Sequence, residues 1–271
     1  MASIPYIEPR AYEFFKDTWR IELGGHGCFL LLGKEKAMLI DTGMNRCNLR
    51  EFIKESITDL PVIVANTHGH FDHTGGNGWF SEVYMSAFAA GEAKNVFPNI
   101  EHPEDFPTNY EITVIEEGYV FDLGGRRLKT IATPCHSPGS LSFIDTDKRL
   151  LFTGDEFEAG QILIGGPRQP GQPSKAELFM ANLNKYKSHE AEFDYICPAH
   201  NGTPIVKDYI DRYIELAKKI FAGEEGMTKV TSATWDGHGR PVPPYMRRLN
   251  TLGTAGVVYN YDEAVEEAKK R

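Results

Sequence analysis

The chain has 271 residues, of which 41% are hydrophobic and 25% are charged, and its formal net charge is -9. This is the composition of an ordinary globular protein, at a length near the upper end of what one hydrophobic core serves. The acidic balance without a Lys/Arg block argues against a nucleic-acid partner, and no stretch approaches the roughly 18 apolar residues that cross a membrane.

The first part of the chain is predicted to combine short strands with one helix. Apolar runs predict three strands, over residues 19–23, 28–33 and 36–41. The short gap between the last two favours a hairpin. A helix is expected over residues 48–57, because Asn48 and Glu51 have the spacing of a capping box. A buried strand over residues 61–66 follows.

The second part repeats this pattern of strands and helices. Five further strands are expected, over residues 111–115, 126–132, 141–146, 149–154 and 193–198. One helix is expected to begin at Ser174, with Glu177 as its capping partner, and another to span residues 205–222. Gly and Pro mark residues 160–173 as a loop. The order of elements favours two packed sheets with helices outside them.

The cysteines are scattered along the chain without a CxxC pair. The sequence contains four, which are Cys28, Cys47, Cys135 and Cys197. This pattern favours reduced thiols over a disulfide framework. The first ten residues, MASIPYIEPR, do not combine a basic start with an apolar stretch. We therefore expect a cytoplasmic location.

A cluster of histidines and one aspartate follows the buried strand 61–66. The stretch ANTHGHFDHTGG, residues 65–76, contains His68, His70, Asp72 and His73. Imidazole nitrogens and carboxylate oxygens suit zinc, manganese or iron. A loop leaving a strand can direct the first two histidines to one ion, and Asp72 with His73 to another. The alternative is a polar turn whose side chains cap the next helix.

Three later residues of metal-ligating type come where predicted strands end. His136 lies in the turn TPCHSPGS, Asp155 follows LFTG, and His200 lies in CPAHNG. A single histidine in a turn is more often a surface residue than a ligand. Together with the HGHFDH cluster, however, the three residues complete a ligand set for two ions.

Five sequence elements in this order resemble the metallo-β-lactamase superfamily. They are LIDTG (39–43), THGHFDHTGG (67–76), TPCHSPGS (133–140), LFTGD (151–155) and PAHNG (198–202). The resemblance implies an α/β protein with a four-layer αβ/βα sandwich, in which two packed mixed β-sheets are flanked by helices. It also implies one domain over residues 1–271, built from similar halves of about 1–125 and 126–271.

The resemblance further implies a two-metal centre. The first ion would be held by His68, His70 and His136, the second by Asp72, His73 and His200, and both by a bridging Asp155. Asp41 would support the site from behind without being a ligand. Two zinc ions are expected, with iron or manganese as alternatives.

The chemistry implied by this centre is hydrolysis. A metal-bridged hydroxide would attack the carbonyl of a small carboxylic derivative, such as a lactone, ester, thioester or β-lactam amide. Asp72 is the candidate catalytic residue, orienting the nucleophile or passing its proton to the leaving group. The expected partner is therefore a small-molecule substrate, with no nucleic acid and no membrane, and a homodimer remains open.

Three other functions are compatible with the same ligands. One is an iron-dependent redox enzyme similar to the persulfide dioxygenases, although these use a reduced ligand set. Diiron oxygen-reducing members generally carry Glu where this chain has His70. A phosphodiesterase is the second alternative. The third is a binding protein that uses the metal as a structural staple, which would leave no coordination position for water.

Segments outside the ligand motifs are expected to line the substrate pocket. These segments are residues 24–28, 86–110, 160–173 and 234–248. Candidate substrate contacts in them are His26, Trp235, His238 and Tyr245, although such residues are more often ordinary surface or packing residues. Cys135 and Cys197 lie near expected ligands in sequence, but buried thiols are commonly inert, so neither is assigned as a nucleophile.

Overall fold

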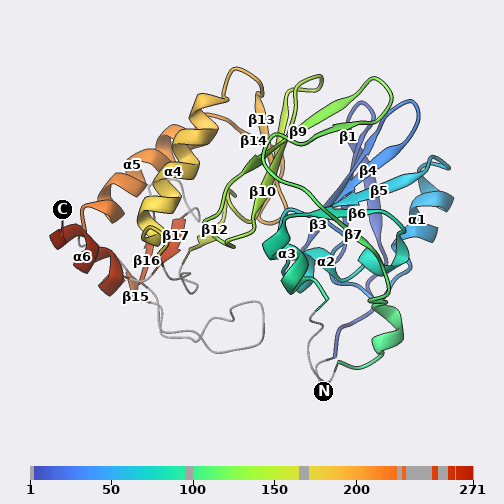
Figure 1. Ribbon diagram of the computed structural model, residues 1–271, viewed down its shortest axis with the longest axis horizontal. Helices are drawn as coiled ribbons and strands as arrows, with labels where there is room; N and C mark the ends of the chain where they lie inside the picture. Colours follow the sequence, from blue (N-terminus) through green and yellow to red (C-terminus); the bar gives the residue numbers. More distant parts are fainter. Residues whose placement is uncertain are drawn as a thin grey trace. The chain divides into compact units, whose positions relative to one another are not determined.

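The computed structural model describes two compact units of the chain (Figure 1). The described residues are 3–94, 100–164, 171–224, 228–229, 246–249, 256–259 and 261–270. Unit 1 comprises residues 1–132 and 141–147, and unit 2 comprises residues 133–140 and 148–271. The single domain with similar halves stays a prediction.

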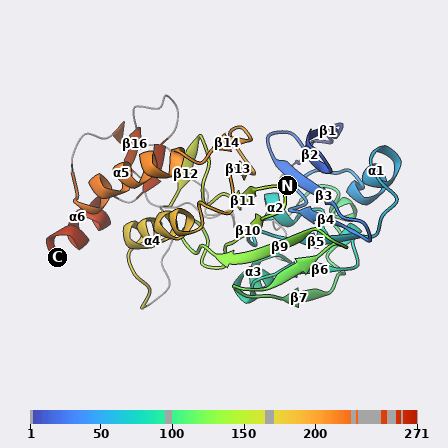
Figure 2. The same cartoon turned by 90° about the horizontal axis from the view of Figure 1, so that it is seen from above.

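Unit 1 contains a mixed sheet whose strands lie side by side in chain order (Figure 2). Its seven described strands are β1 (Arg10–Phe15), β2 (Thr18–Glu22), β3 (Gly27–Leu32), β4 (Ala37–Ile40), β5 (Val62–Ala65), β6 (Val83–Met85) and β7 (Ile112–Val114). Strands β1 to β4 pair antiparallel, whereas β4 to β7 pair parallel. Strand β4 is buried along its whole length, as expected for a sheet covered on both faces.

The described residues of unit 1 form three short helices, and the apolar sides of the first and the third pack on this sheet. They are α1 (Leu49–Ser56), α2 (Phe71–Thr74) and α3 (Ala87–Glu92). Leu49 and Ile53 of α1 and Ala89 of α3 share one core cluster with Leu39 and Val64 of the sheet. The predicted start of α1 is confirmed, because the Asn48 side chain accepts a hydrogen bond from the Glu51 amide at 3.2 Å.

Unit 1 also contains three antiparallel strands that follow the mixed sheet in sequence. They are β8 (Val120–Asp122), β9 (Arg127–Ala132) and β10 (Leu141–Asp145). Arg126, at the start of β9, donates a hydrogen bond from Nε to Asp145 Oδ2 at 2.7 Å. Its Nη2 donates to the Thr18 hydroxyl at 2.7 Å. The buried ion pair of Arg126 and Asp145 therefore joins β10 to β2 within unit 1.

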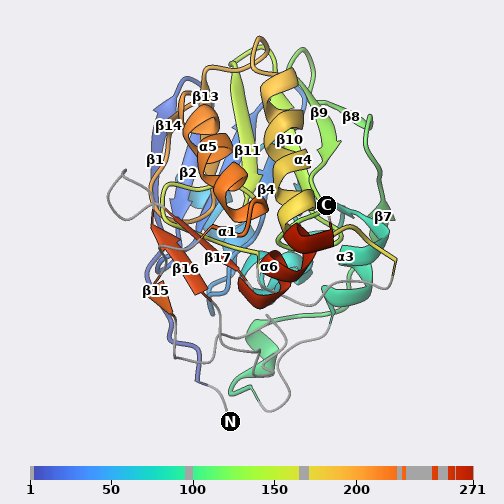
Figure 3. The ribbon, with the colours of Figure 1, turned by 90° about the vertical axis from the view of Figure 1, so that its left-hand side faces the viewer.

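Unit 2 combines parallel and antiparallel strands with three helices (Figure 3). Its described strands are β11 (Leu150–Gly154), β12 (Gln161–Leu163), β13 (Tyr195–Pro198), β14 (Ile205–Val206), β15 (Thr228–Lys229), β16 (Met246–Leu249) and β17 (Gly256–Tyr259). Its described helices are α4 (Lys175–Ser188), α5 (Tyr209–Phe221) and α6 (Tyr261–Lys270). Strand β11 pairs parallel with β13, and helices α4 and α5 pack side by side. The capping box of Ser174 and Glu177 at the start of α4 is confirmed.

Two boundary predictions in unit 2 were wrong. Residues 160–173 were predicted to be entirely loop, yet β12 lies within them because it pairs with β17, almost a hundred positions later in the sequence. The helix predicted over residues 205–222 begins only at Tyr209, because Ile205 and Val206 pair with β13. For β12 the deciding partner is distant in sequence, whereas β14 is a two-residue strand that pairs with β13, the strand directly before it. No helix in the described ranges is long and apolar enough to span a bilayer.

Candidate metal centre

The HGHFDH cluster begins where strand β5 ends at Ala65 and continues into helix α2. His70 is the N-cap residue of α2, so Asp72 and His73 lie within the helix itself. Gly69 allows the chain to pass close to α3, because a Cβ atom there would lie 2.7 Å from the Ala89 carbonyl oxygen. The sequence thus folds the cluster into a tight turn on the carboxyl end of a buried parallel strand.

The cluster side chains gather in unit 1. The ring centroid of His68 lies 4.5 Å from that of His70 and 4.1 Å from that of His73. The Nε2 atom of His73 is 3.6 Å from Oδ2 of Asp72. His68 and His73 are buried, whereas the Asp72 side chain is 29% exposed. Unit 1 therefore presents three imidazoles and one carboxylate at one place.

Asp41, at the end of β4, orients two of these imidazoles. Its Oδ2 atom lies 2.8 Å from Nδ1 of His73 and accepts a hydrogen bond from the Thr67 hydroxyl at 2.8 Å. The Thr67 oxygen in turn lies 3.1 Å from Nδ1 of His68. Since Nδ1 of each ring lies against an oxygen atom, Nε2 is the ring nitrogen that each histidine can offer to a metal ion.

Three polar residues that the sequence reasoning did not select support the cluster from behind. The Asn66 side chain donates to the backbone oxygen of His73 at 2.8 Å. Asn77 donates to the Asn66 side chain at 2.8 Å and accepts from the Thr42 hydroxyl at 2.8 Å. The sequence offered a signal for Asn66 alone, because it lies in ANTHG directly after an apolar strand, whereas Thr42 and Asn77 lie outside this stretch.

His26 also reaches this cluster. Its Nε2 atom lies 3.3 Å from Oδ2 of Asp72. His26 follows Gly24 and Gly25, whose φ angles of 76° and 101° are in the left-handed region that favours glycine. The sequence had suggested only a substrate contact for His26, and the structure places it beside the candidate catalytic carboxylate.

Unit 2 brings together the other three predicted ligands. Asp155 follows β11 and His200 follows β13, and the carboxyl ends of these paired parallel strands meet at one edge. Oδ1 of Asp155 lies 3.4 Å from Nε2 of His200, and its Oδ2 lies 3.6 Å from Nε2 of His136. One carboxylate therefore contacts both histidines, each through a different oxygen.

The loop that carries His136 is held by contacts from β12 and α4. Nδ1 of His136 lies 2.8 Å from the Leu163 carbonyl oxygen, so Nε2 is the ring nitrogen that His136 can offer to a metal ion. Nζ of Lys175 donates a hydrogen bond to the Cys135 carbonyl oxygen. Burial raises the pKa of the Cys135 thiol well above its ordinary value, which agrees with an inert thiol rather than a nucleophile.

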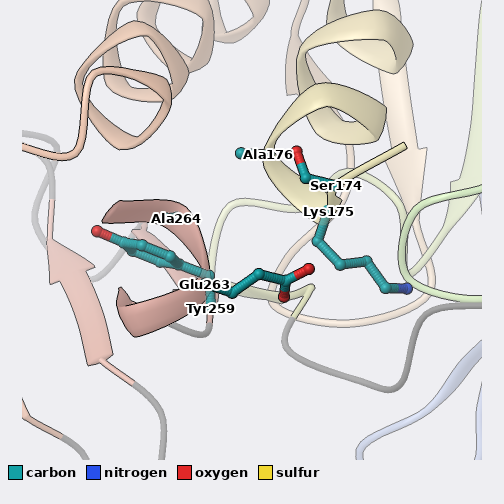
Figure 4. A pocket seen from close by; sticks show the side chains of 6 residues that line it. All are labelled: Ser174, Lys175, Ala176, Tyr259, Glu263 and Ala264. Atoms are coloured by element: carbon teal, nitrogen blue, oxygen red, sulfur yellow. The ribbon is translucent and has the colours of Figure 1, made fainter. Parts of the chain in front are cut away.

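A small pocket in unit 2 lies beside the same lysine (Figure 4). It is lined by Ser174, Lys175, Ala176, Tyr259, Glu263 and Ala264. Glu263 and Tyr259 come from α6 and β17, across from the first turn of α4. None of the predicted metal ligands lines it.

The donor types in both units fit a divalent transition metal. The candidate ligands are His68, His70, Asp72 and His73 in unit 1, and His136, Asp155 and His200 in unit 2. Neutral imidazoles with carboxylates are the set that zinc prefers, and iron and manganese also accept it. Trp235, His238, Tyr245 and most of segment 234–248 lie outside the described residues.

The family of the chain follows from a comparison with known proteins. The model of the metallo-beta-lactamase superfamily matches residues 22–225. This range covers both halves of the candidate ligand set, from the cluster after β5 to His200. The chain belongs to the metallo-beta-lactamase superfamily.

Two relatives of established name are thioesterases. The human acyl-coenzyme A thioesterase MBLAC2 is 27% identical over 165 residues, which are 50% of this chain and 59% of that protein. The atrochrysone carboxyl ACP thioesterase nsrC of Aspergillus novofumigatus is 23% identical over 250 residues, 89% of this chain and 70% of that protein. The match thus spans less than two thirds of the length of the human relative.

Solved structures confirm the predicted fold. A metallo-beta-lactamase from Pontibacter korlensis has a TM-score of 0.57 at 16% identity, covering 78% of this chain and 99% of that one. The rubredoxin oxygen:oxidoreductase of Desulfovibrio gigas has a TM-score of 0.56 at 16% identity, covering 78% of this chain and 62% of that one. The fold is therefore the four-layer sandwich of two mixed sheets flanked by helices. Because it carries both hydrolases and an oxidoreductase, it does not by itself select a reaction.

Proposed function

We propose that this protein is a metal-dependent thioesterase that hydrolyses small acyl thioesters. The observation that carries the proposal is the arrangement of His68, His73 and His136, each held through Nδ1 so that Nε2 is left to bind a metal ion. The two named relatives act on different carriers, coenzyme A and an acyl carrier protein, but both act on a thioester. The thioester bond is the shared chemistry.

We further propose that the protein binds two zinc ions through the candidate ligands of unit 1 and those of unit 2. The unit 2 ligands are His136, Asp155 and His200. In support, Asp155 directs one oxygen to each of two histidines, as a carboxylate shared between two ions would. When bound, such ions would act as Lewis acids and would lower the pKa of bound water toward neutrality.

Asp72 is the residue of this chain that we propose handles the proton of the attacking water. Its carboxylate is partly exposed, and Oδ2 lies between His26 at 3.3 Å and His73 at 3.6 Å. From this position it can accept a hydrogen bond from water and orient it. A thiol is far more acidic than an alcohol, so a thiolate leaves with little help from an acid. Thioester hydrolysis therefore needs a positioned carboxylate more than a strong proton donor.

The direct test is an assay of the hydrolysis of acyl-coenzyme A and acyl-pantetheine thioesters, in which the release of the free thiol is measured. Oxygen esters, lactones and a β-lactam serve as comparison substrates. We expect thioester hydrolysis that disappears on chelation and returns with zinc, and elemental analysis that finds two metal ions per chain. The variant His200→Ala should lower the metal content. Thioester hydrolysis that persists in chelated protein, or oxygen consumption by iron-loaded protein without thioester hydrolysis, would contradict the proposal.

A further inference from the structure

Two buried glutamates directly follow Asp155 in the sequence GDEFE. The exposed fractions of Glu156 and Glu158 are 1% and 4%. A buried carboxylate is costly unless hydrogen-bond donors surround it. The hydrogen-bond donors that surround these two glutamates therefore indicate which parts of the chain the carboxylates hold in place.

Glu156 holds the loop that carries His136. Its Oε1 atom accepts hydrogen bonds from the backbone amides of Cys135 at 3.1 Å and Ser137 at 3.3 Å. These are the residues on either side of His136. Its Oε2 atom accepts from the Asn182 side chain of α4 at 3.0 Å. The carboxylate thus ties the backbone on both sides of a candidate ligand to the middle of a helix.

Glu158 has the corresponding position toward His200. Its Oε2 atom accepts a hydrogen bond from the side chain of Asn201, the residue after His200. Asn201 has a φ angle of 55°, so its backbone is in the left-handed region, where asparagine is better tolerated than most residues. The Tyr213 hydroxyl of α5 donates to the backbone oxygen of Glu158 at 2.9 Å, which fixes the glutamate in place.

Phe157 anchors the segment between the two glutamates. It is fully buried, and its ring makes edge contacts with Tyr186 of α4 and Tyr213 of α5, with centroids 5.9 Å and 5.0 Å apart. The Thr153 hydroxyl donates to the Phe157 backbone oxygen at 2.8 Å. The segment after Asp155 is therefore rigidly attached to both helices.

We infer that Glu156 and Glu158 are positioning residues that set the His136 and His200 loops relative to Asp155, so that the three side chains of unit 2 are placed as one ligand set. The inference rests on the proposed function in taking these side chains as metal ligands. A metal site tolerates only small displacements of its ligands, and the groups that hold them contribute to affinity. Without Glu156, the amides on either side of His136 would lose their hydrogen-bond acceptor, and without Glu158 the Asn201 side chain would lose its own. In either case the neighbouring histidine would move.

The test compares Glu156→Ala, Glu158→Ala and Asn201→Gly with Ile220→Ala. Ile220 is buried near the end of α5, so its truncation should destabilise the fold without removing a side-chain hydrogen bond to either loop. Glycine at position 201 suits the left-handed backbone while removing the side chain that Glu158 holds. We expect the first three variants to bind zinc about 10- to 100-fold more weakly in chelator competition, and Ile220→Ala to bind as the wild type does.

Two further readouts separate positioning from general stability. In metal-free protein, hydrogen exchange at the Cys135 and Ser137 amides should be faster in Glu156→Ala than in Ile220→Ala. Glu156→Gln keeps one acceptor oxygen for these amides, so it should recover most of the zinc affinity. Glu158→Ala combined with Asn201→Gly should weaken binding no more than either change alone, because both remove the same contact.

The inference is overturned if the zinc affinities of Glu156→Ala and Glu158→Ala, and the amide exchange of Glu156→Ala, match those of Ile220→Ala. If Glu156→Ala does not fold, Glu158→Ala and Asn201→Gly decide the matter by their zinc affinity relative to Ile220→Ala. A wild-type protein that binds no metal refutes the proposed function instead. In that case exchange in metal-free protein still shows whether Glu156 fixes the loop.

Discussion

The Nδ1 atom of His73 lies 2.8 Å from Oδ2 of Asp41, and both side chains are buried. Asp41 adopts a φ angle of 59°, in a region that few residues other than glycine, asparagine and aspartate occupy readily. Its second oxygen accepts a hydrogen bond from the Thr67 backbone amide at 2.8 Å. The strained backbone at Asp41 is thus held where one carboxylate can reach both His73 and Thr67.

Replacing Asp41 should weaken metal binding while leaving the fold largely intact. Asparagine tolerates the left-handed backbone and fills the same space, but it lacks the charge that supports His73. We expect Asp41→Asn to bind zinc about 10- to 100-fold more weakly, measured by chelator competition. Asp122→Asn is a suitable control, since Asp122 accepts backbone hydrogen bonds only in an exposed turn. Equal affinity of Asp41→Asn and wild type would show that the contact has no such role.

The parts of the fold that were predicted correctly are those with a local signal. The strand before His68 is a continuous apolar run, and the caps at Asn48 and Ser174 need only a partner three residues away. Strand β12 has its partner far away in the sequence, and β14 is only two residues long, so no local pattern showed them. Strand β1 was not predicted either, because it is a half-exposed edge strand without a regular apolar pattern.

The candidate site divides in the same way. The ligand types could be read from HGHFDH and from three strand ends, because metal ligation restricts side-chain chemistry. The groups that hold those ligands are ordinary polar residues such as Asn66, Asn77 and Glu156, and only the folded chain shows what they contact. The contact of His26 with Asp72 likewise joins segments more than 40 positions apart in sequence.

Breaking the buried ion pair of unit 1 should destabilise the protein strongly. Nη2 of Arg126 lies 2.6 Å from Oδ2 of Asp145, and the two side chains are 5% and 0% exposed. Removing one partner leaves an uncompensated buried charge, so Arg126→Met should lower the free energy of unfolding by about 3–5 kcal/mol in urea titrations. Lys218→Ala, which breaks an exposed pair with Glu215, should change it by less than about 1 kcal/mol. Similar effects for both variants would refute this expectation.

Acid should selectively weaken the ion pair at the start of β13. Hydrogen bonds from Arg149, followed by one from Lys207, lower the pKa of Asp194 to about 2 from its ordinary value of 3.8. The native state therefore holds this carboxylate deprotonated more strongly than the unfolded state does. The resulting stabilisation is complete above pH 4 and is lost as the pH falls toward 2.

The variant Asp194→Asn makes this dependence measurable. Its melting temperature should lie below that of the wild type by a constant amount from pH 7 to pH 5, and the difference should shrink as the pH falls below 4. Because the pair is exposed, 1 M salt should reduce the difference at neutral pH. A difference that stays constant down to pH 2.5 would exclude Asp194 as the group that titrates.

The thiols should report on alkaline unfolding. All four cysteines are buried, and burial raises the pKa of Cys47 to about 11 from an ordinary value of 9.0. At pH 8 only about one Cys47 thiol in a thousand is then a reactive thiolate. Native protein should therefore react slowly with a disulfide reagent such as Ellman's, whereas protein in guanidinium should release four equivalents of the reagent's thiolate within minutes.

In the unfolded chain the Cys47 thiol ionises at a lower pH than in the native protein, so its contribution to stability is complete below pH 9 and is lost as the pH rises toward 11. Cys47→Ala should accordingly flatten the decline in melting temperature between pH 9 and 11, and a decline as steep as in the wild type would assign it to other groups.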